Sequence, residues 1–214
     1  MNADIQAVQS RFDRVAAGWD SNPARVALVK GIVEAIRQAI PLNPNMVALD
    51  FGAGTGLLTL GLLPYVARIT AVDASSEMLK VLAEKLSALE IGSVTPWHGD
   101  IVREPLPEAG YDLVVSSMVL HHIADVPQVF KSLRRCLRPA GWIALADLDS
   151  EDGSFHPDPT GVFHQGFDRQ QIANWLEVAG FQDVSLRDAY RMVRPQPEGG
   201  TREYPVFLAR GRVG

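Results

Sequence analysis

The pattern of apolar and polar residues changes once along the chain, near position 45. In residues 5–15 and again in residues 26–36, apolar side chains recur every three or four positions, which predicts two helices. Asn22-Pro23 supplies the start of the second helix, because Asn caps helices and Pro fits their first turn. Beyond these helices, short apolar runs alternate with helical stretches, so the pattern predicts an α/β core.

Five of the apolar runs in this core are typical of strands. We expect the strands at residues 46–51, 68–73, 94–98, 112–116 and 142–146, with helices at 75–89 and 126–137. The run at 46–51 is nearly continuous, which is typical of a strand buried on both faces. Right-handed crossovers between parallel strands place helices on both sides of the sheet.

The pattern weakens after Asp149. Residues 150–166 combine Gly, Pro, Asp and aromatic residues without a period, which predicts a long loop. We expect a further helix that begins after Asp168 as N-cap, runs to Ala179 and is ended by Gly180.

Two strand-like runs, 184–193 and 204–210, close the sequence and face each other across residues 195–200, which predicts a hairpin. The expected fold class is therefore α/β: a doubly wound, mostly parallel seven-stranded sheet with an antiparallel C-terminal hairpin and two extra N-terminal helices. We expect the 214 residues to form a single domain. Its parts are a helical cover (1–45), a ligand-binding core (46–149), a substrate-side loop (150–167) and the C-terminal helix and hairpin (168–214).

Composition narrows the class of protein. With 47% hydrophobic and 21% charged residues, the sequence is that of an ordinary globular chain. A net charge of -5 argues against a nucleic-acid partner, which would need a basic face. No apolar run is long enough for a bilayer span, and the start MNADIQAVQSRFDR is expected to be a polar helix and not a signal peptide. With Cys136 alone, no internal disulfide can form, and we expect a cytoplasmic protein.

The densest chemical signal is the segment Asp50-Phe51-Gly52-Ala53-Gly54-Thr55-Gly56, which follows the first strand and leads into a helix. Glycines permit positive φ and let a ligand approach the backbone, and the helix N-terminus favours an anionic group. The next strand ends in Asp73, whose carboxylate can accept hydrogen bonds from two ribose hydroxyls. Together these features predict a nucleotide-like ligand at the carboxyl edge of the sheet.

Glycine spacing separates two kinds of ligand. The dinucleotide fingerprint Gly-x-Gly-x-x-Gly would place its third glycine at position 57, whereas here it stands at Gly56. A nicotinamide-dependent oxidoreductase remains an alternative, but this spacing and the lack of a Tyr-x-x-x-Lys pair oppose it.

The motif resembles that of the class I S-adenosylmethionine-dependent methyltransferases, especially the small-molecule group that includes ubiquinone/menaquinone-biosynthesis-like enzymes. Further segments match the family pattern: Gly99-Asp100 after the third strand, the fourth-strand run 111–122, and Leu137–Trp142, where Ala140 replaces a usual glycine. The resemblance implies a Rossmann-like fold and S-adenosylmethionine as cofactor. The cofactor-binding residues that it implies are Asp50, Gly52, Ala53, Gly54, Gly56, Asp73, Ala74, Met78, Gly99, Asp100, Ile101, Ser116 and Ser117.

The resemblance also implies an in-line displacement at a sulfonium methyl group. His121 and His122 follow the fourth strand and are the candidate catalytic residues, as a base or as groups that orient a ligand. Adjacent histidines point in different directions, so we expect at most one to enter the pocket. Metal-dependent relatives take an aspartate where this chain has Ser116 and Ser117, so we expect no metal.

An acidic segment follows the fifth strand and is expected to be a solvated turn, with a divalent metal site as the alternative. Its members are Asp147, Asp149, Glu151 and Asp152.

The acceptor is expected to contact residues 10–20 and 150–166, which both carry aromatic side chains. The candidate substrate residues are Trp19, His156, Phe163 and His164, and packing onto the fold is the alternative for each. The chain lacks an (Asn/Asp)-Pro-Pro-(Tyr/Phe) tetrapeptide and a Pro-Cys dipeptide, which argues against nucleic-acid and glutamine methylation. We therefore expect a methyltransferase acting on a small molecule, without membrane insertion. A non-catalytic S-adenosylmethionine-binding protein remains an alternative, and the oligomeric state is open.

Overall fold

A computed structural model describes residues 3–101, 104, 106, 108–195 and 199–214. Its centre is a seven-stranded sheet with the strand order β3-β2-β1-β4-β5-β7-β6. The strands are β1 (Val47–Phe51), β2 (Arg68–Asp73), β3 (Val94–His98), β4 (Tyr111–Ser117), β5 (Leu137–Leu148), β6 (Phe181–Pro195) and β7 (Thr201–Val213). Strands β1 to β5 pair in parallel, and β7 runs antiparallel between β5 and β6. The predicted fold class is confirmed.

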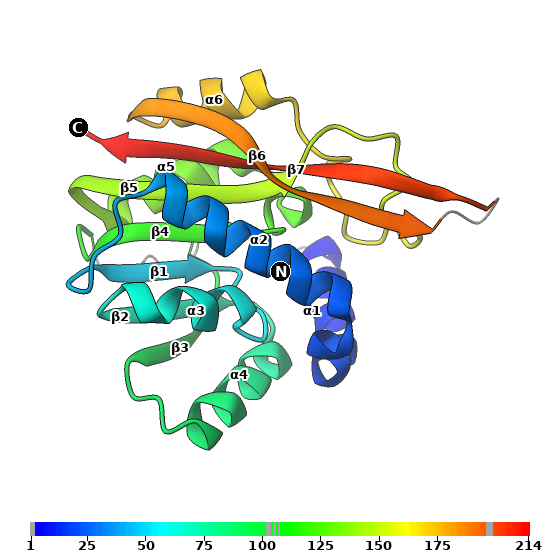
Figure 1. Cartoon of the computed structure of the whole chain (residues 1–214), viewed down its shortest axis with the longest axis horizontal. Helices are drawn as coiled ribbons and strands as arrows, with labels where there is room; N and C mark the ends of the chain where they lie inside the picture. Colours follow the sequence, from blue (N-terminus) through cyan, green and yellow to red (C-terminus); the bar gives the residue numbers. More distant parts are fainter. Residues whose placement is uncertain (1–2, 102–103, 105, 107, 196–198) are drawn as a thin grey trace.

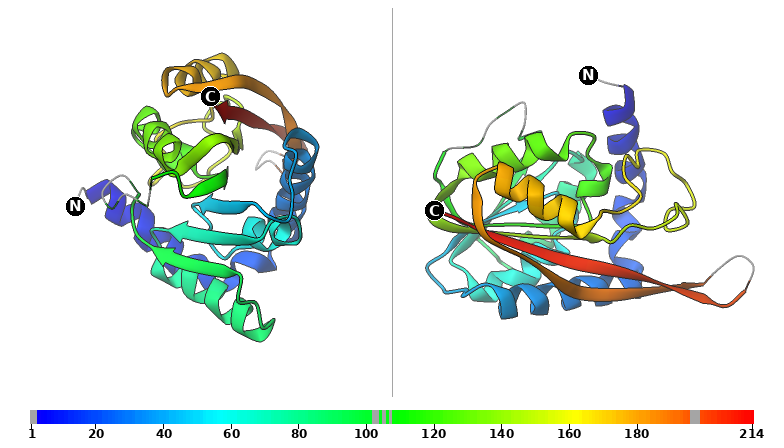
Figure 2. Two further views of the ribbon diagram at one scale, coloured as in Figure 1. Left: turned by 90° about the vertical axis from the view of Figure 1, so that its left-hand side faces the viewer. Right: turned by 90° about the horizontal axis from the view of Figure 1, so that it is seen from above.

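Helices cover both faces of this sheet (Figures 1 and 2). On one face lie α2 (Pro23–Ala39), α3 (Leu57–Leu62) and α4 (Ser76–Ala88), and on the other lie α5 (Val126–Cys136) and α6 (Arg169–Val178). Helix α1 (Ala3–Val15) and the short 3-10 helices η1 (Ala16–Ser21), η2 (Leu63–Tyr65) and η3 (Leu120–His122) complete the set in the described residues. None of the described helices is long and apolar enough to cross a lipid bilayer.

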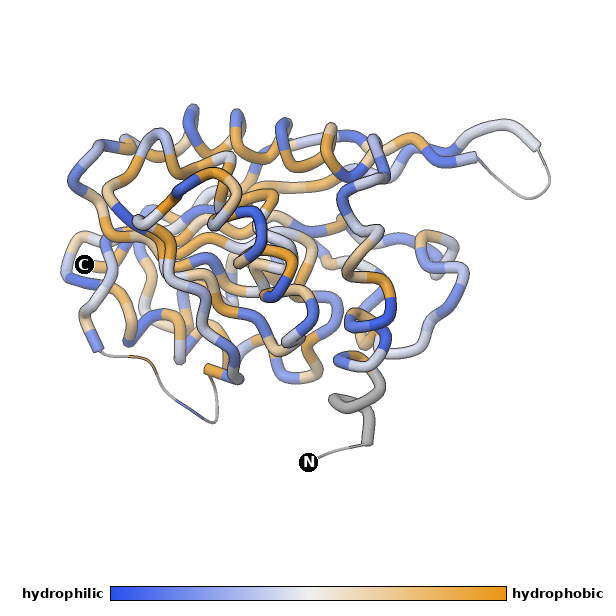
Figure 3. Tube along the Cα trace, turned by 90° about the horizontal axis from the view of Figure 1, so that it is seen from below, coloured by the Kyte–Doolittle hydropathy of each residue, from blue (hydrophilic) through white to orange (hydrophobic). Residues whose placement is uncertain are grey.

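Strand β1 illustrates how the core forms. All five of its residues are buried, as its apolar run predicts. Leu49 packs with α5 and α6 on one face, while Ala48 packs with α2 and α3 on the other, because side chains alternate along a strand. Figure 3 shows the same result for the whole chain, since hydrophobic segments gather in the central strands.

The predicted helix ends are also observed. Asn22 caps α2 by accepting a 2.9 Å hydrogen bond from the Ala24 amide, and Asp168 caps α6 in the same way through the Gln171 amide. Gly180 ends α6 with a φ of 93°. These local signals depend on nearby residues alone, which is why the sequence predicts them well.

Strand β5 and the hairpin are longer than predicted. Leu137 already pairs with Tyr111, ahead of a register shift, and Ala140 follows with a left-handed φ of 62°. Strands β6 and β7 pair antiparallel and form the predicted hairpin, which extends well beyond the body of the molecule in Figure 1. Residues 196–198 of its expected turn lie outside the described residues.

The carboxyl ends of the parallel strands meet at one edge of the sheet. Strand order reverses between β1 and β4, and such a switch point is where ligands bind in open α/β sheets. Helix α1 and the loop 150–166 lie at this same edge, although about 140 residues separate them in the chain (Figures 1 and 2). The fold therefore brings both predicted acceptor segments to the glycine-rich turn.

Candidate active site

The glycine-rich turn begins where β1 ends. Gly52, Gly54 and Gly56 all have positive φ, at 73°, 55° and 83°. The amides of Gly52 and Ala53 donate to the Val72 carbonyl of the neighbouring strand at 2.8 and 2.9 Å. A Cβ at Gly54 would meet no atom within 4 Å, whereas one at Gly56 would clash with Leu82 of α4. Gly54 thus allows a ligand to approach the backbone, and Gly56 allows two helices to pack closely.

Asp73, at the end of β2, is held beside this turn. Its Oδ2 accepts a 2.7 Å hydrogen bond from the Gly54 amide, and its Oδ1 accepts one of 2.8 Å from Ser75. Burial raises the pKa of Asp73, while the backbone amides oppose that shift. Each carboxylate oxygen has a second lone pair, so Asp73 can still accept hydrogen bonds from a ligand.

Asp50, at the end of β1, is 1% exposed. Its Oδ2 accepts a 2.6 Å hydrogen bond from the Thr59 hydroxyl, and its Oδ1 has no partner among the described residues. Burial, with a smaller contribution from the charge of Asp73, raises the pKa of Asp50 to about 7. A buried carboxylate oxygen without a partner is costly, so this oxygen suits a donor or cation on a ligand.

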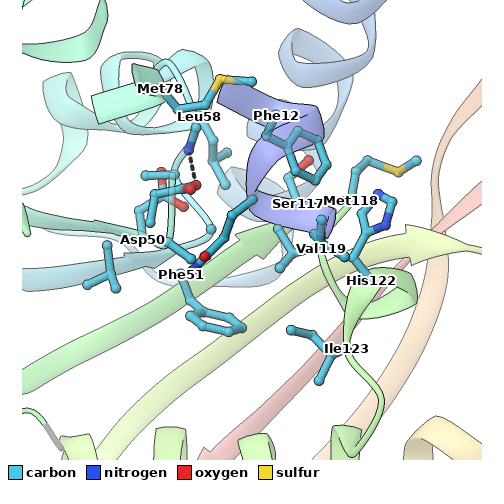
Figure 4. Close-up of a pocket in the computed structure, with 18 of the residues that line it drawn as sticks. Phe12, Asp50, Phe51, Leu58, Met78, Ser117, Met118, Val119, His122 and Ile123 are labelled. Atoms are coloured by element: carbon cyan, nitrogen blue, oxygen red, sulfur yellow. Dashed lines mark hydrogen bonds between the residues drawn. The ribbon is translucent and has the colours of Figure 1, made fainter. Parts of the chain in front are cut away.

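A cavity of about 500 Å³ opens over the glycine-rich turn, within the size range of small-molecule sites. Figure 4 shows Asp50 and Met78 on one side of it and Phe12, His122 and Ile123 on another. The predicted site residues that line it are Asp50, Gly52, Ala53, Gly54, Asp73, Ala74, Met78, Gly99, Asp100, Ser117, His122, Trp19 and Phe163.

Three of the predicted cofactor residues do not line this cavity. Gly56 packs α3 against α4, as described above. The Ser116 hydroxyl instead donates to the Phe51 carbonyl at 2.7 Å, and Ile101 is 1% exposed within the apolar cluster beneath the sheet edge. Of the two serines that end β4, Ser117 alone lines the cavity, because neighbouring residues of a strand face opposite sides.

Two aspartates connect the N-terminal helices by hydrogen bonds to the side of the cavity that carries the glycine-rich turn. Asp13 accepts a 2.5 Å hydrogen bond from the Ser75 hydroxyl at the start of α4. Asp20 accepts one of 2.6 Å from the Thr55 hydroxyl in the glycine-rich turn, and pairs with Lys85 at 2.6 Å. The cover therefore lies directly over the turn that bears the three glycines.

Aromatic side chains of the cover form one wall of the cavity. Phe12 packs edge-on against Trp19 and His122, with ring centroids 5.7 and 5.1 Å apart. The Arg25 guanidinium lies 3.8 Å from the centre of the Trp19 ring and also lines the cavity. Partial burial lowers the pKa of Arg25, against the attraction of Asp20.

The expectation of a solvated acidic turn is wrong for Asp147, which lies near the end of β5, whereas Asp152 is exposed. Asp147 is fully buried, and its Oδ1 accepts a 2.6 Å hydrogen bond from His121 Nδ1. Burial alone would raise the pKa of Asp147, but the charge and hydrogen bond of His121 lower it overall. The other acids have separate partners: Asp149 pairs with Arg169 through both oxygens, Asp152 pairs with Arg202, and Glu151 accepts from the Phe155 amide.

Only one of the two adjacent histidines reaches the cavity. His122 lines it, whereas His121 is 1% exposed and turned toward Asp147. Their rings nevertheless lie 4.2 Å apart, and His156 from the loop lies 4.9 Å from His121. Burial and repulsion by the neighbouring imidazoles lower the pKa of His122 to about 4 and that of His156 to about 3. His122 is therefore neutral at neutral pH.

The aromatic residues of the loop 150–166, and Phe167 directly after it, have two kinds of surroundings: some pack in the core and others line the cavities. Phe155 and Phe167 are each 2% exposed and belong to the core. Phe163 lines the main cavity, and together with His156 and His164 it also lines a second cavity of about 380 Å³. The His164 ring is fixed by a 2.9 Å hydrogen bond between Nε2 and the Ile123 carbonyl.

Several residues of the site were not predicted. Val8, Leu28, Arg25 and Met118 line the main cavity, as does Phe12, which was expected only as part of the segment 10–20. The grouping of His156 with the two adjacent histidines appears only in the fold. The apolar face of the first predicted helix was a signal for Val8 and Phe12. The spacing of histidines in the sequence does not predict this grouping, because His156 lies 34 positions after His122.

Comparison with known proteins agrees with this geometry. Residues 49–145 match the model of a methyltransferase domain family. An uncharacterized methyltransferase of Schizosaccharomyces pombe is 35% identical over 157 residues, which cover 66% of this chain and 55% of that protein. A malonyl-[acyl-carrier protein] O-methyltransferase of Serratia marcescens is 33% identical over 143 residues, covering 67% and 53%.

A crystal structure of an S-adenosylmethionine-dependent methyltransferase from Aquifex aeolicus has the same fold. Its TM-score is 0.68 at 20% identity, with 96% of this chain and 98% of that chain covered. The chain spans about half the length of the curated relatives it matches. The matched family does not distinguish the narrower ubiquinone/menaquinone-biosynthesis-like group. The family match over residues 49–145, the shared fold and the Gly52/Gly54/Gly56 turn with Asp73 agree with one another: the chain carries a methyltransferase domain with the fold of S-adenosylmethionine-dependent methyltransferases.

Proposed function

We propose that this protein transfers a methyl group from S-adenosylmethionine to a small apolar or amphipathic acceptor. One observation carries the proposal. A single cavity joins the glycine-rich turn and Asp73 to a largely apolar wall that contains Phe12, His122 and Phe163. A nucleotide-like cofactor and a second ligand can therefore lie side by side in it.

The residues of the cofactor end fit the parts of S-adenosylmethionine. Asp73 accepts hydrogen bonds from the ribose hydroxyls, and Gly54 leaves room for close approach to the backbone. The Asp50 oxygen without a partner attracts the positive charge of the methionine part. Gly99 and Asp100 line the cavity where the adenine is expected. Ser117, Ala74 and Met78 complete the proposed cofactor surface.

Methyl transfer requires little chemical assistance from the protein. The acceptor attacks the methyl carbon in line, the carbon–sulfur bond breaks, and a neutral thioether leaves without needing a proton. Most of the rate therefore comes from alignment and from exclusion of water. His122 faces the cavity as a neutral imidazole, so it can accept a hydrogen bond from the acceptor and orient it. Its lowered pKa makes it a weak base.

The acceptor side indicates the class of substrate. Val8, Phe12, Leu28 and Phe163 give it an apolar character, and the net charge of -5 opposes a nucleic acid. We therefore propose a small molecule as acceptor. A cytoplasmic location is proposed with it, because Cys136, the one cysteine of the sequence, is a buried free thiol.

Calorimetry and a coupled assay test this function. The protein should bind S-adenosylhomocysteine at one site per chain and nicotinamide dinucleotides far more weakly. Incubation with S-adenosylmethionine and a panel of small apolar acids, phenols, thiols and amines should release S-adenosylhomocysteine with at least one of them. Binding of the cofactor without turnover on any acceptor class would contradict catalysis. Binding of nicotinamide dinucleotides alone would contradict the cofactor.

A further inference from the structure

Three of the five histidines of the chain meet at one point beside the main cavity. His121 and His122 come from η3 and His156 comes from the loop, and one ligand nitrogen of each lies within 4.8 Å of the other two. The ring centroids are 4.2, 4.9 and 5.5 Å apart. We call these residues the histidine cluster.

Hydrogen bonds fix two of these rings from behind. His121 Nδ1 lies 2.6 Å from the buried carboxylate of Asp147, and His122 Nδ1 lies 2.7 Å from the Gly161 carbonyl. A carbonyl or an ionised carboxylate only accepts hydrogen bonds, so Nδ1 of each ring donates, and Nε2 is the ring nitrogen left to face a ligand. Histidines that bind metals are held in this way by a carboxylate or a carbonyl.

The third ring supplies an independent observation. His156 Nε2 is buried and has no hydrogen-bond partner among the described residues. Buried polar nitrogen atoms almost always have a partner, and one without a partner needs an explanation. Here the atom belongs to a ring that lies against two other imidazoles, and each of these is hydrogen-bonded through Nδ1.

We propose that the histidine cluster is a binding site for a divalent transition metal, with Zn²⁺ as its representative. Three imidazoles suit Zn²⁺, Ni²⁺, Cu²⁺ or Fe²⁺, whereas Mg²⁺ and Ca²⁺ prefer oxygen ligands. A Zn–N distance of about 2.0–2.1 Å places tetrahedral nitrogens about 3.4 Å apart. Small movements of the three side chains from their separations of up to 4.8 Å therefore complete the site.

A metal bound at the histidine cluster would lie close enough to the main cavity to contact the acceptor. Three protein ligands leave a tetrahedral ion one open position for water or another donor atom. His122 lines the main cavity, and His156 lines the second one, so the ion would lie between the two. An acceptor with an oxygen, nitrogen or sulfur donor can then coordinate it. This inference goes beyond the proposed function and replaces the expectation of a metal-free site. The metal then takes the His122 nitrogen that would otherwise accept a hydrogen bond from the acceptor.

Metal binding can be measured without methyl transfer. Protein dialysed against a chelator and then freed of it should take up one equivalent of Zn²⁺ in competition with a chromophoric chelator. Co²⁺ should give the visible absorption of a tetrahedral site. Zn²⁺ should also raise the melting temperature, because it binds the native state. Absence of uptake by the wild-type protein would overturn the proposal.

Matched variants locate the metal. His156→Gln should weaken Zn²⁺ binding at least 100-fold and abolish the Co²⁺ spectrum, and His122→Gln provides the same test from the other segment. Asp147→Asn, which loosens the support of His121, should weaken binding 10- to 100-fold. His164→Gln is the control, because His164 lies in the same loop but outside the cluster, and its affinity should change less than threefold. Unchanged affinity in both ligand variants would place the metal elsewhere and overturn the proposal.

The failure of this inference and that of the proposed function remain distinguishable. Binding of S-adenosylhomocysteine in the presence of a chelator tests the cofactor site alone, since none of its proposed residues belongs to the histidine cluster.

Discussion

The centre of the cofactor end of the cavity comes from two adjacent strands and the turns that follow them, whereas the acceptor end gathers side chains from separate stretches of chain. Asp50, Gly54 and Asp73 lie within 24 residues of one another, and backbone amides fix their geometry. Phe12, His122 and Phe163 come from three distant elements and meet only through tertiary packing. The first arrangement leaves a motif in the sequence and the second does not.

Substitution of a packed loop residue should give the largest effect. Phe155 is 2% exposed, with its ring 5.1 Å from that of Tyr204 and 3.7 Å from the Arg194 guanidinium. Phe155→Ala should therefore lower the free energy of unfolding by about 3–5 kcal/mol. Phe163→Ala, at a residue that is 38% exposed, should change it by about 0.5 kcal/mol or less. Urea denaturation of both variants measures this difference. Equal losses of unfolding free energy would contradict the assignment of Phe155 to the core and Phe163 to the cavity.

This prediction also shows how far sequence reasoning reached. The strands, the helix caps and the glycine-rich turn depend on local chemistry, so their patterns predicted them. Whether Phe155 or Phe163 faces a cavity depends on contacts with β7 and α1, which no local pattern encodes. Asp147 was misjudged for the same reason, because its partner His121 lies on a different segment.

The ionisation of Asp50 should appear in the pH dependence of stability. Its pKa is raised from 3.8 to about 7, so between these values the native state binds a proton that the unfolded state has released. The contribution of this group to stability is therefore present at low pH and is lost as pH rises toward 7. Without ligand, wild-type protein should lose roughly 2–3 kcal/mol more than Asp50→Asn between pH 5 and pH 8. Parallel curves for the two proteins would contradict the raised pKa.

Substitution of Asp73, which is proposed to bind the ribose, should affect cofactor binding at one end of the cavity only. Asp73→Ala should weaken S-adenosylhomocysteine binding by about 1.5–3 kcal/mol, the range for hydrogen bonds to a charged group. Phe163→Ala should leave this affinity unchanged, because Phe163 belongs to the acceptor end. Calorimetric titration compares the two variants. A cofactor affinity that depends on Phe163 and not on Asp73 would reverse the assignment of the ends.

The smallest effect is expected for the hydrogen bonds between α1 and the loop 150–166. Arg11 donates hydrogen bonds to the carbonyls of Asp158 and Thr160 at 3.1 and 2.7 Å, on the exposed surface. Arg11→Ala should cost less than about 1 kcal/mol of stability, since exposed interactions contribute little. It should raise the KM for the acceptor severalfold without changing cofactor affinity. Arg14→Ala, on the same helix, is the control, and an equal effect on KM there would exclude a specific role for Arg11.

A crystal structure with S-adenosylhomocysteine tests most directly whether the two ends form one methyl-transfer site. The account predicts the ribose hydroxyls on Asp73, the backbone of Gly54 beside the ligand, and the thioether sulfur facing the space bounded by Phe12, His122 and Phe163. The space beyond the sulfur should remain large enough for a small acceptor. Binding of the ligand away from Asp73, or a sulfur enclosed by protein with no space toward His122, would contradict the account.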